Sequence, residues 1–227
     1  MNHDLRCVLA VGNPRGRAER LEGLLAQSET LGFDSVAVVG DLAGEGGYRA
    51  LFEVLGRAGL PAFWVPGPSD APIQDCLREA YSMEIVFPLL RGVHGTLAVA
   101  RHQVIAGIGG EVVDEPGAER DEAARLRYPG WEAEYRLKAL GDLEDKHTVL
   151  LFATPPAHKG LHRPGSEVLA ELVSTYRARL VITGEAERRT GQLGKTMVVS
   201  PGNLANGDYM LIDLHANTAT AHTLAAS

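Results

Sequence analysis

Two glutamates, Glu185 and Glu187, directly follow an apolar strand-like run, residues 180–183, near the C-terminal end of the sequence. Asp41 has a comparable position, because it closely follows the apolar run 35–39. Carboxylate oxygens bind hard divalent cations such as Ca²⁺ and Mg²⁺, and they also form strong paired hydrogen bonds with arginine. If the fold brings these acids together, the sequence predicts either a cation site or an ion-paired pocket.

The elements that must position these acids alternate between strand and helix in the first part of the chain. Short apolar runs at 6–11, 35–39 and 62–65 are typical of buried strands. Between them, leucines recur at helical spacing over 21–31, where Gly32 closes the helix, and over 51–58. This β-α-β-α-β order predicts parallel strands, because parallel neighbours need long helical connections. Ligands in such sheets bind at the carboxyl ends of the strands, where Asp41 lies.

The second half of the chain predicts further strands and fewer helices. A hairpin is expected around Arg101 and His102, a surface excursion over 111–121, and a helix with its apolar face formed by Trp131, Tyr135, Leu140 and Leu143. Ser166 has the position of a helix N-cap. A buried strand is expected at 148–152, and further strands at 180–183, 196–200, 209–214 and 219–224. The pattern by itself leaves open a sandwich of two mixed sheets and a single doubly wound sheet.

The composition excludes several classes of protein. A chain of 227 residues, 45% hydrophobic and 22% charged, is typical of one soluble globular domain, which we expect to span residues 1–227. The net charge of -7 argues against nucleic acid as a partner. No apolar run reaches the roughly 18 residues of a membrane span, and the N-terminus lacks a signal-peptide pattern. Cys7 and Cys76 are expected to be free thiols in a reducing compartment, which predicts a cytoplasmic protein. A homo-oligomer is a separate possibility that the sequence leaves open.

Five segments that follow the predicted strands resemble the motifs of the calcineurin-like metallophosphoesterases, in the same order along the chain. The family motifs read Asp-x-His-Gly, Gly-Asp, Gly-Asn-His-Asp, His-x-Pro-Pro and Gly-His-x-His. The corresponding segments here are Asn13-Pro14-Arg15-Gly16, Gly40-Asp41, Gly67-Pro68-Ser69-Asp70, Ala153-Thr154-Pro155-Pro156 and Gly184-Glu185-Ala186-Glu187. The resemblance implies an α/β fold, a four-layer α/β/β/α sandwich of two mixed sheets.

The same resemblance implies that the family's two-metal site is degenerate in this chain. Among the positions that hold the metals in the family, only Asp41, the bridging one, is unchanged. Asn13 is a poorer ligand than aspartate, and Pro68 and Ala153 have no side-chain ligand atom. Arg15 occupies a ligand position, although a guanidinium is always charged and cannot bind a metal ion.

Three arrangements of this pocket are open from the sequence. In the first, Arg15 replaces a metal ion electrostatically and pairs with Asp41, Glu185 and Glu187. In the second, those three carboxylates hold one hard divalent cation, with Ca or Mg favoured over Mn, Fe or Zn. In the third, a transition-metal site is rebuilt from other residues.

These arrangements predict two alternative functions. The first is a catalytically weak or inactive protein that binds a small molecule or phosphate-like anion in the old pocket, whose expected residues are Asn13, Arg15, Ser69, Thr154 and His158. The alternative is an active divalent-metal-dependent phosphoesterase, in which Arg15 and Asp70 are the catalytic candidates. The resemblance also implies that Ser69 replaces the histidine that protonates the leaving group. His158 and His162 lie after Pro155-Pro156, in a segment that could reach the pocket or remain solvated.

Overall fold

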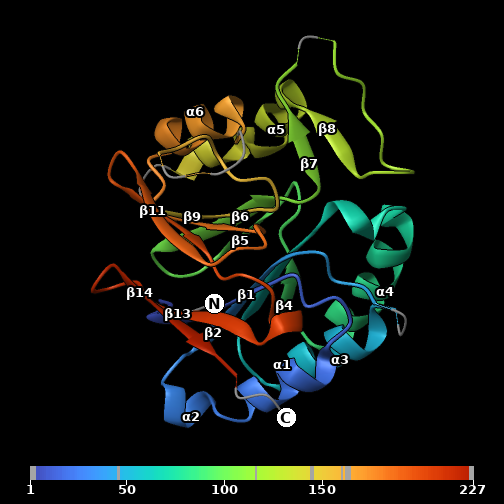
Figure 1. Ribbon diagram of the computed structural model, residues 1–227, viewed down its shortest axis with the longest axis vertical. Helices are drawn as coiled ribbons and strands as arrows, with labels where there is room; N and C mark the ends of the chain where they lie inside the picture. The colour runs from blue at the N-terminus through green and yellow to red at the C-terminus, as the bar shows by residue number, and fades with distance from the viewer. Residues whose placement is uncertain are drawn as a thin grey trace.

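The computed structural model describes residues 4–44, 47–115, 117–143, 146–159, 161 and 165–224. Two six-stranded sheets lie face to face, and helices cover the outer face of each (Figure 1). This arrangement is the α/β/β/α sandwich that the family resemblance implies. No described helix is both long enough and apolar enough to cross a membrane.

The first sheet has the strand order β14-β13-β1-β2-β3-β4. Strands β1 to β4 are parallel, whereas β13 and β14 pair antiparallel at one edge, so the sheet is mixed. Its strands span Cys7–Gly12 (β1), Ser35–Gly40 (β2), Ala62–Pro66 (β3), Leu90–Gly92 (β4), Asp208–Asp213 (β13) and Thr218–Thr223 (β14).

The second sheet has the order β11-β12-β10-β9-β6-β5. Its four central strands are parallel, and the outer strands β5 and β11 are antiparallel to their neighbours. The strands span Leu97–Val99 (β5), Gln103–Ile108 (β6), His147–Phe152 (β9), Leu180–Thr183 (β10), Arg189–Leu193 (β11) and Thr196–Ser200 (β12). The hairpin predicted around Arg101 and His102 is confirmed as β5–β6.

Alternation along each strand divides the core into layers, because successive side chains of a strand point to opposite faces. In β1, Val8 and Ala10 face the second sheet, while Leu9 and Val11 pack under the helices of the first sheet. Those helices are α1 (Ala18–Leu25), α2 (Ser28–Leu31), α3 (Arg49–Arg57) and α4 (Ile73–Val86). Helices α5 (Gly130–Leu137) and α6 (Glu167–Thr175) cover the second sheet (Figure 1).

Short elements complete the described chain. They are the separate two-stranded sheet of β7 (Glu111–Val113) and β8 (Arg127–Pro129), and the 3-10 helices η1 (Pro68–Asp70), η2 (Lys138–Leu143) and η3 (Leu204–Asn206). The excursion predicted over 111–121 is therefore wrong at its start, where Val112 and Val113 are buried in β7.

The predicted helix face containing Trp131 and Tyr135 is also wrong. These two side chains are 66% and 62% exposed, and α5 instead turns Ala133 and Leu137 to the core. The α-helix ends at Leu137 and continues as a 3-10 turn, so the helical spacing assumed in the sequence does not extend to Leu140. Cys7 and Cys76 are free thiols, as expected.

Candidate ligand pocket at the carboxyl ends of the strands

The segments after β1, β2, β3, β9 and β10 meet at one edge of the sandwich and enclose a cavity of about 370 Å³. They meet because parallel strands of both sheets end there. The cavity is lined by Asn13, Arg15, Asp41, Pro68, Ala153, Pro155, Gly184, Glu185, Ala186, Glu187 and Arg189. Asn13, Arg15, Asp41, Glu185 and Glu187 thus lie together, although they are far apart in the sequence.

Asn13 joins the two sheets through both ends of its amide. Its Oδ1 accepts the backbone N–H of Asp41 at 3.0 Å, and its Nδ2 donates to the backbone oxygen of Gly184 at 2.9 Å. The residue is 5% exposed and has a φ of 43°, a value that is uncommon outside glycine. A Cβ on Gly40 would lie 2.2 Å from Asn13 Oδ1, so this close approach requires glycine. The amide is therefore part of the loop structure.

Arg15 forms an ion pair with Asp41, with 3.2 Å between Nη2 and Oδ2. The other carboxylate oxygen, Oδ1, accepts the backbone N–H of Ser69 at 3.1 Å. Arg15 has a φ of 46°, and its backbone N–H donates to the backbone oxygen of Asp41. The side chain of Arg15 is 54% exposed, against 12% for that of Asp41. Both oxygens of the aspartate are thus engaged, whereas the guanidinium keeps donors that face solvent.

Glu187 forms an ion pair with Arg189, the first residue of β11. Arg189 was not among the site residues expected from the sequence. The sequence motifs gave no signal for it, because the chain bends at Ala186 and Glu187 before Arg189 begins β11. No three described His, Cys, Asp or Glu side chains converge to form a group able to hold a metal ion.

Asp70 does not offer its carboxylate to the cavity. Its two oxygens accept the backbone N–H groups of Leu42, Ala43 and Gly67, and the residue is 1% exposed. Burial raises the pKa of Asp70, although these backbone donors act in the opposite direction. The contacts give Asp70 a positioning role, because they join the loop carrying Asp41 to the loop after β3.

Three other predicted pocket residues use their polar groups elsewhere. Ser69 contributes its backbone N–H to Asp41. The hydroxyl of Thr154 donates to the backbone oxygen of Gly110 and accepts the N–H of Val112. His158 Nδ1 lies 2.8 Å from the backbone oxygen of Pro156. None of the three is among the residues that line the cavity, and His162 lies outside the described residues.

Comparison with known proteins places this architecture in a family. Residues 46–224 match the family described as metallophosphoesterase, calcineurin superfamily. The chain belongs to this superfamily. Its match covers the last three motif segments, while Asn13–Gly16 and Gly40–Asp41 precede the matched range. No curated protein matches the chain.

Several solved structures share the fold. The crystal structure of TT1561 from Thermus thermophilus is 41% identical, with a TM-score of 0.91, and the match covers 97% of this chain and 99% of that one. A dimetal phosphatase from Danio rerio is 8% identical with a TM-score of 0.66, covering 97% and 96% of the two chains. An archaeal phosphodiesterase is 8% identical with a TM-score of 0.57, covering 96% and 99%. At this low identity, the last two show the fold alone.

The contacts of Asn13 predict a measurable cost of restoring the family's aspartate. Asn13→Asp removes the donor to Gly184 and places a carboxylate oxygen against that backbone oxygen in a buried position. We expect the free energy of unfolding in urea to fall by about 2 kcal/mol. Asn217→Asp is a matched control, because Asn217 is exposed and also has positive φ. Equal stability of the two variants would contradict the prediction.

Proposed function

We propose that this chain is a catalytically weak or inactive metallophosphoesterase-fold protein that binds a small anionic ligand in the old active-site pocket. The observation that supports this proposal most directly is the Arg15–Asp41 ion pair. The bridging aspartate of the family directs one oxygen to a guanidinium and the other to the backbone N–H of Ser69. The positively charged guanidinium of Arg15 thus lies beside Asp41, where the family binds metal ions.

The donor atoms of the pocket do not fit two metal ions. A dinuclear centre needs several ligands for each ion, and zinc, iron and similar ions favour imidazole. The amide of Asn13 is engaged with the backbone at both ends, and Pro68 and Ala153 offer no side-chain ligand. These side chains therefore support no catalytic step that depends on a metal pair.

The remaining polar groups favour a ligand that carries both a negative charge and hydrogen-bond donors. Arg15 is half exposed, and a guanidinium can give two parallel hydrogen bonds to a phosphate or carboxylate. Glu185 and Glu187 line the same cavity and accept hydrogen bonds, so a fully deprotonated anion without donors is disfavoured. Dihydrogen phosphate and the monoanion of a phosphate monoester have both features.

The alternative is hydrolysis of phosphate esters with one hard divalent ion. It is supported by the presence of Asp41, Glu185 and Glu187 on the wall of one cavity. This arrangement requires Asp41 to exchange its guanidinium partner for the ion, so Arg15 must move away. The two proposals therefore differ in what the substitution of Arg15 does.

The experiment measures bound metal, turnover and anion binding on the same preparations. We expect no stoichiometric Mn, Fe or Zn, and no aryl phosphate hydrolysis that depends on Mn²⁺, Mg²⁺ or Ca²⁺. Inorganic phosphate at low ionic strength should stabilise the protein thermally, and Arg15→Gln should weaken its binding at least tenfold, about 1.4 kcal/mol.

The matched control is Arg17→Gln, which removes an exposed guanidinium two residues away. It should bind phosphate as the unsubstituted chain does. Metal-dependent turnover that is lost in Asp41→Ala would overturn the binding proposal in favour of the hydrolase. Unchanged phosphate binding in Arg15→Gln would remove Arg15 from the proposed site.

A further inference from the structure

One face of α4 is apolar and lies open to water. Leu77, Tyr81 and Ile85 are 47%, 71% and 66% exposed, and they follow one another at four-residue spacing along the helix. The side chains that α4 turns to the core of the first sheet are Ile73, Cys76, Ala80 and Met83. Residues four apart form a row on a helix surface, so the three exposed side chains form an apolar stripe that the core does not use.

The stripe runs beside the edge at which both sheets end. On the same side of α4, Glu84 accepts the backbone N–H of Gly92 in β4 at 2.7 Å. β4 is the last strand of the first sheet, and β5 is the last strand of the second. A cavity of about 580 Å³ between these strands is lined in part by Leu89 and Val99, which are 37% and 40% exposed. We call the stripe and these two residues the edge patch.

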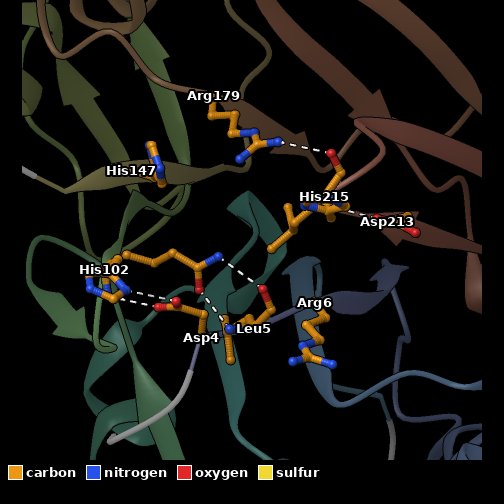
Figure 2. A pocket seen from close by; sticks show the side chains of 10 residues that line it. Asp4, Leu5, Arg6, His102, His147, Arg179, Asp213 and His215 are labelled. Carbon is orange, nitrogen blue, oxygen red and sulfur yellow. Dashed lines mark hydrogen bonds and ion pairs between the residues drawn. The ribbon is translucent and has the colours of Figure 1, made fainter.

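Contacts between the sheets hold this edge in a fixed position. The β5–β6 hairpin is joined to the start of the chain, where Asp4 accepts the backbone N–H of His102 at 2.8 Å and lies 2.9 Å from its Nδ1 (Figure 2). The buried side chain of Gln103 forms two further hydrogen bonds, of 2.8 and 3.0 Å, with the backbone of Leu5. A partner that docks at this edge therefore meets a preformed surface, which lowers the entropic cost of association.

The area of the edge patch is that of the apolar core of a protein interface. Five partly exposed side chains of this size leave on the order of 500 Å² of apolar surface in water, whereas the largest patch of a typical monomer covers roughly 300–600 Å². A stable dimer buries about 800 Å² on each copy, of which somewhat more than half is apolar. The exposed polar residues that flank the stripe and would form the rim are Gln74, Arg78 and Ser82.

We propose that the edge patch is the interface between two copies of this chain. Leu77 and Ile85 lie at equal distances along the helix on either side of Tyr81, so the stripe is complementary to itself. A twofold axis at Tyr81 makes the two α4 helices antiparallel and places Leu77 of one copy beside Ile85 of the other, twice in the same interface. Rows of residues four apart pack against each other at a crossing angle of about −50°, the commonest class in globular proteins. A site for a different protein would not need this symmetry.

Sedimentation equilibrium of the full chain tests whether this dimer forms. We expect a dissociation constant below about 10 μM. Tyr81→Glu places two carboxylates at the twofold axis and should weaken dimerisation at least a hundredfold. The matched control is Tyr135→Glu, because Tyr135 is 62% exposed on α5, outside the edge patch, and this variant should remain dimeric. Both positions are exposed, so both variants should have the circular dichroism spectrum of the unsubstituted chain.

A pair of charge substitutions tests the antiparallel arrangement itself. Leu77→Lys or Ile85→Glu alone sets a charge against an apolar side chain of the other copy, and each should weaken the dimer at least tenfold. The double variant Leu77→Lys/Ile85→Glu sets opposite charges beside each other across the interface, so it should dimerise at least tenfold more tightly than either single variant.

Four results would overturn the proposal. If the unsubstituted chain is a monomer up to about 100 μM, the edge patch belongs to a different partner. If Tyr81→Glu dimerises as the unsubstituted chain does, the dimer uses another face. If Tyr135→Glu weakens the dimer as much as Tyr81→Glu, the effect is one of general charge. If the double charge variant is no tighter than the single ones, the two helices are not antiparallel about Tyr81.

Discussion

Asp70→Ala is expected to lower the free energy of unfolding by about 4 kcal/mol, because it leaves several buried donors without an acceptor. The carboxylate accepts the backbone N–H groups of Leu42, Ala43 and Gly67 at distances of 2.8 to 3.2 Å. Each of these N–H groups was removed from water when the loops packed together. Their loss should also loosen the segment that presents Asp41 to the pocket.

Urea unfolding followed by circular dichroism measures the effect as a shift of the transition midpoint. Asp70→Asn tests the cause, since the amide retains one acceptor oxygen but turns an NH₂ group toward backbone donors, so it should recover only part of the loss. Asp75→Ala is the control, because Asp75 forms an exposed ion pair with Arg78 on α4, and such pairs contribute little. A loss below about 1 kcal/mol in Asp70→Ala would show that water replaces the carboxylate.

Acid sensitivity centred on His94 is the second large effect that we expect. Gly109 donates its backbone N–H to His94 Nδ1 at 2.8 Å, so the neutral ring must carry its proton on Nε2, which lies 3.1 Å from the Tyr128 hydroxyl. Protonation of Nδ1 would place two donors against each other. Burial, together with the positive charge of Arg136, lowers the pKa of His94 to about 3, while Glu122 acts in the opposite direction.

The sign of the pH effect follows from this depressed pKa. An unfolded histidine binds a proton below pH of about 6.5, whereas the folded His94 remains neutral until pH is near 3. The contribution of His94 to stability is therefore complete above a pH of about 6.5 and is lost progressively as pH falls toward 3. We expect the loss to reach about 5 kcal/mol over this interval.

His94→Asn isolates this proton, because asparagine can accept the Gly109 N–H without titrating. At a pH of about 7.5 the variant should be less stable than the unsubstituted chain by about 2 kcal/mol, since it loses the contact with Tyr128. The difference in unfolding free energy should shrink as pH falls below about 6.5 and reverse near a pH of about 5. His215→Asn, at an exposed turn, should follow the unsubstituted chain. Parallel pH curves for His94→Asn and the unsubstituted chain would rule out His94 as the cause.

Local sequence patterns were sufficient to place the long buried strands and the edge at which the pocket forms, but they missed β4, β7, β8 and β11. Apolar runs such as 35–39 and 62–65 predict β2 and β3 within one residue, because a fully buried strand needs apolar residues on both faces. The motif segments place Asn13, Asp41 and Glu185 at strand ends, and parallel strands bring such ends together. These properties depend on hydrophobic pattern and on topology rules.

The contacts that these residues make were set by packing between distant segments. Asn13 and Gly184 bond across 171 positions, and Asp70 turns to backbone donors instead of the cavity, because side-chain direction depends on which loops pack together. Trp131 is exposed because α5 packs its other face, with Ala133 and Leu137, against the second sheet. The side chain of Gln103 likewise bonds to the backbone of Leu5, 98 positions away, only because the two sheets close together.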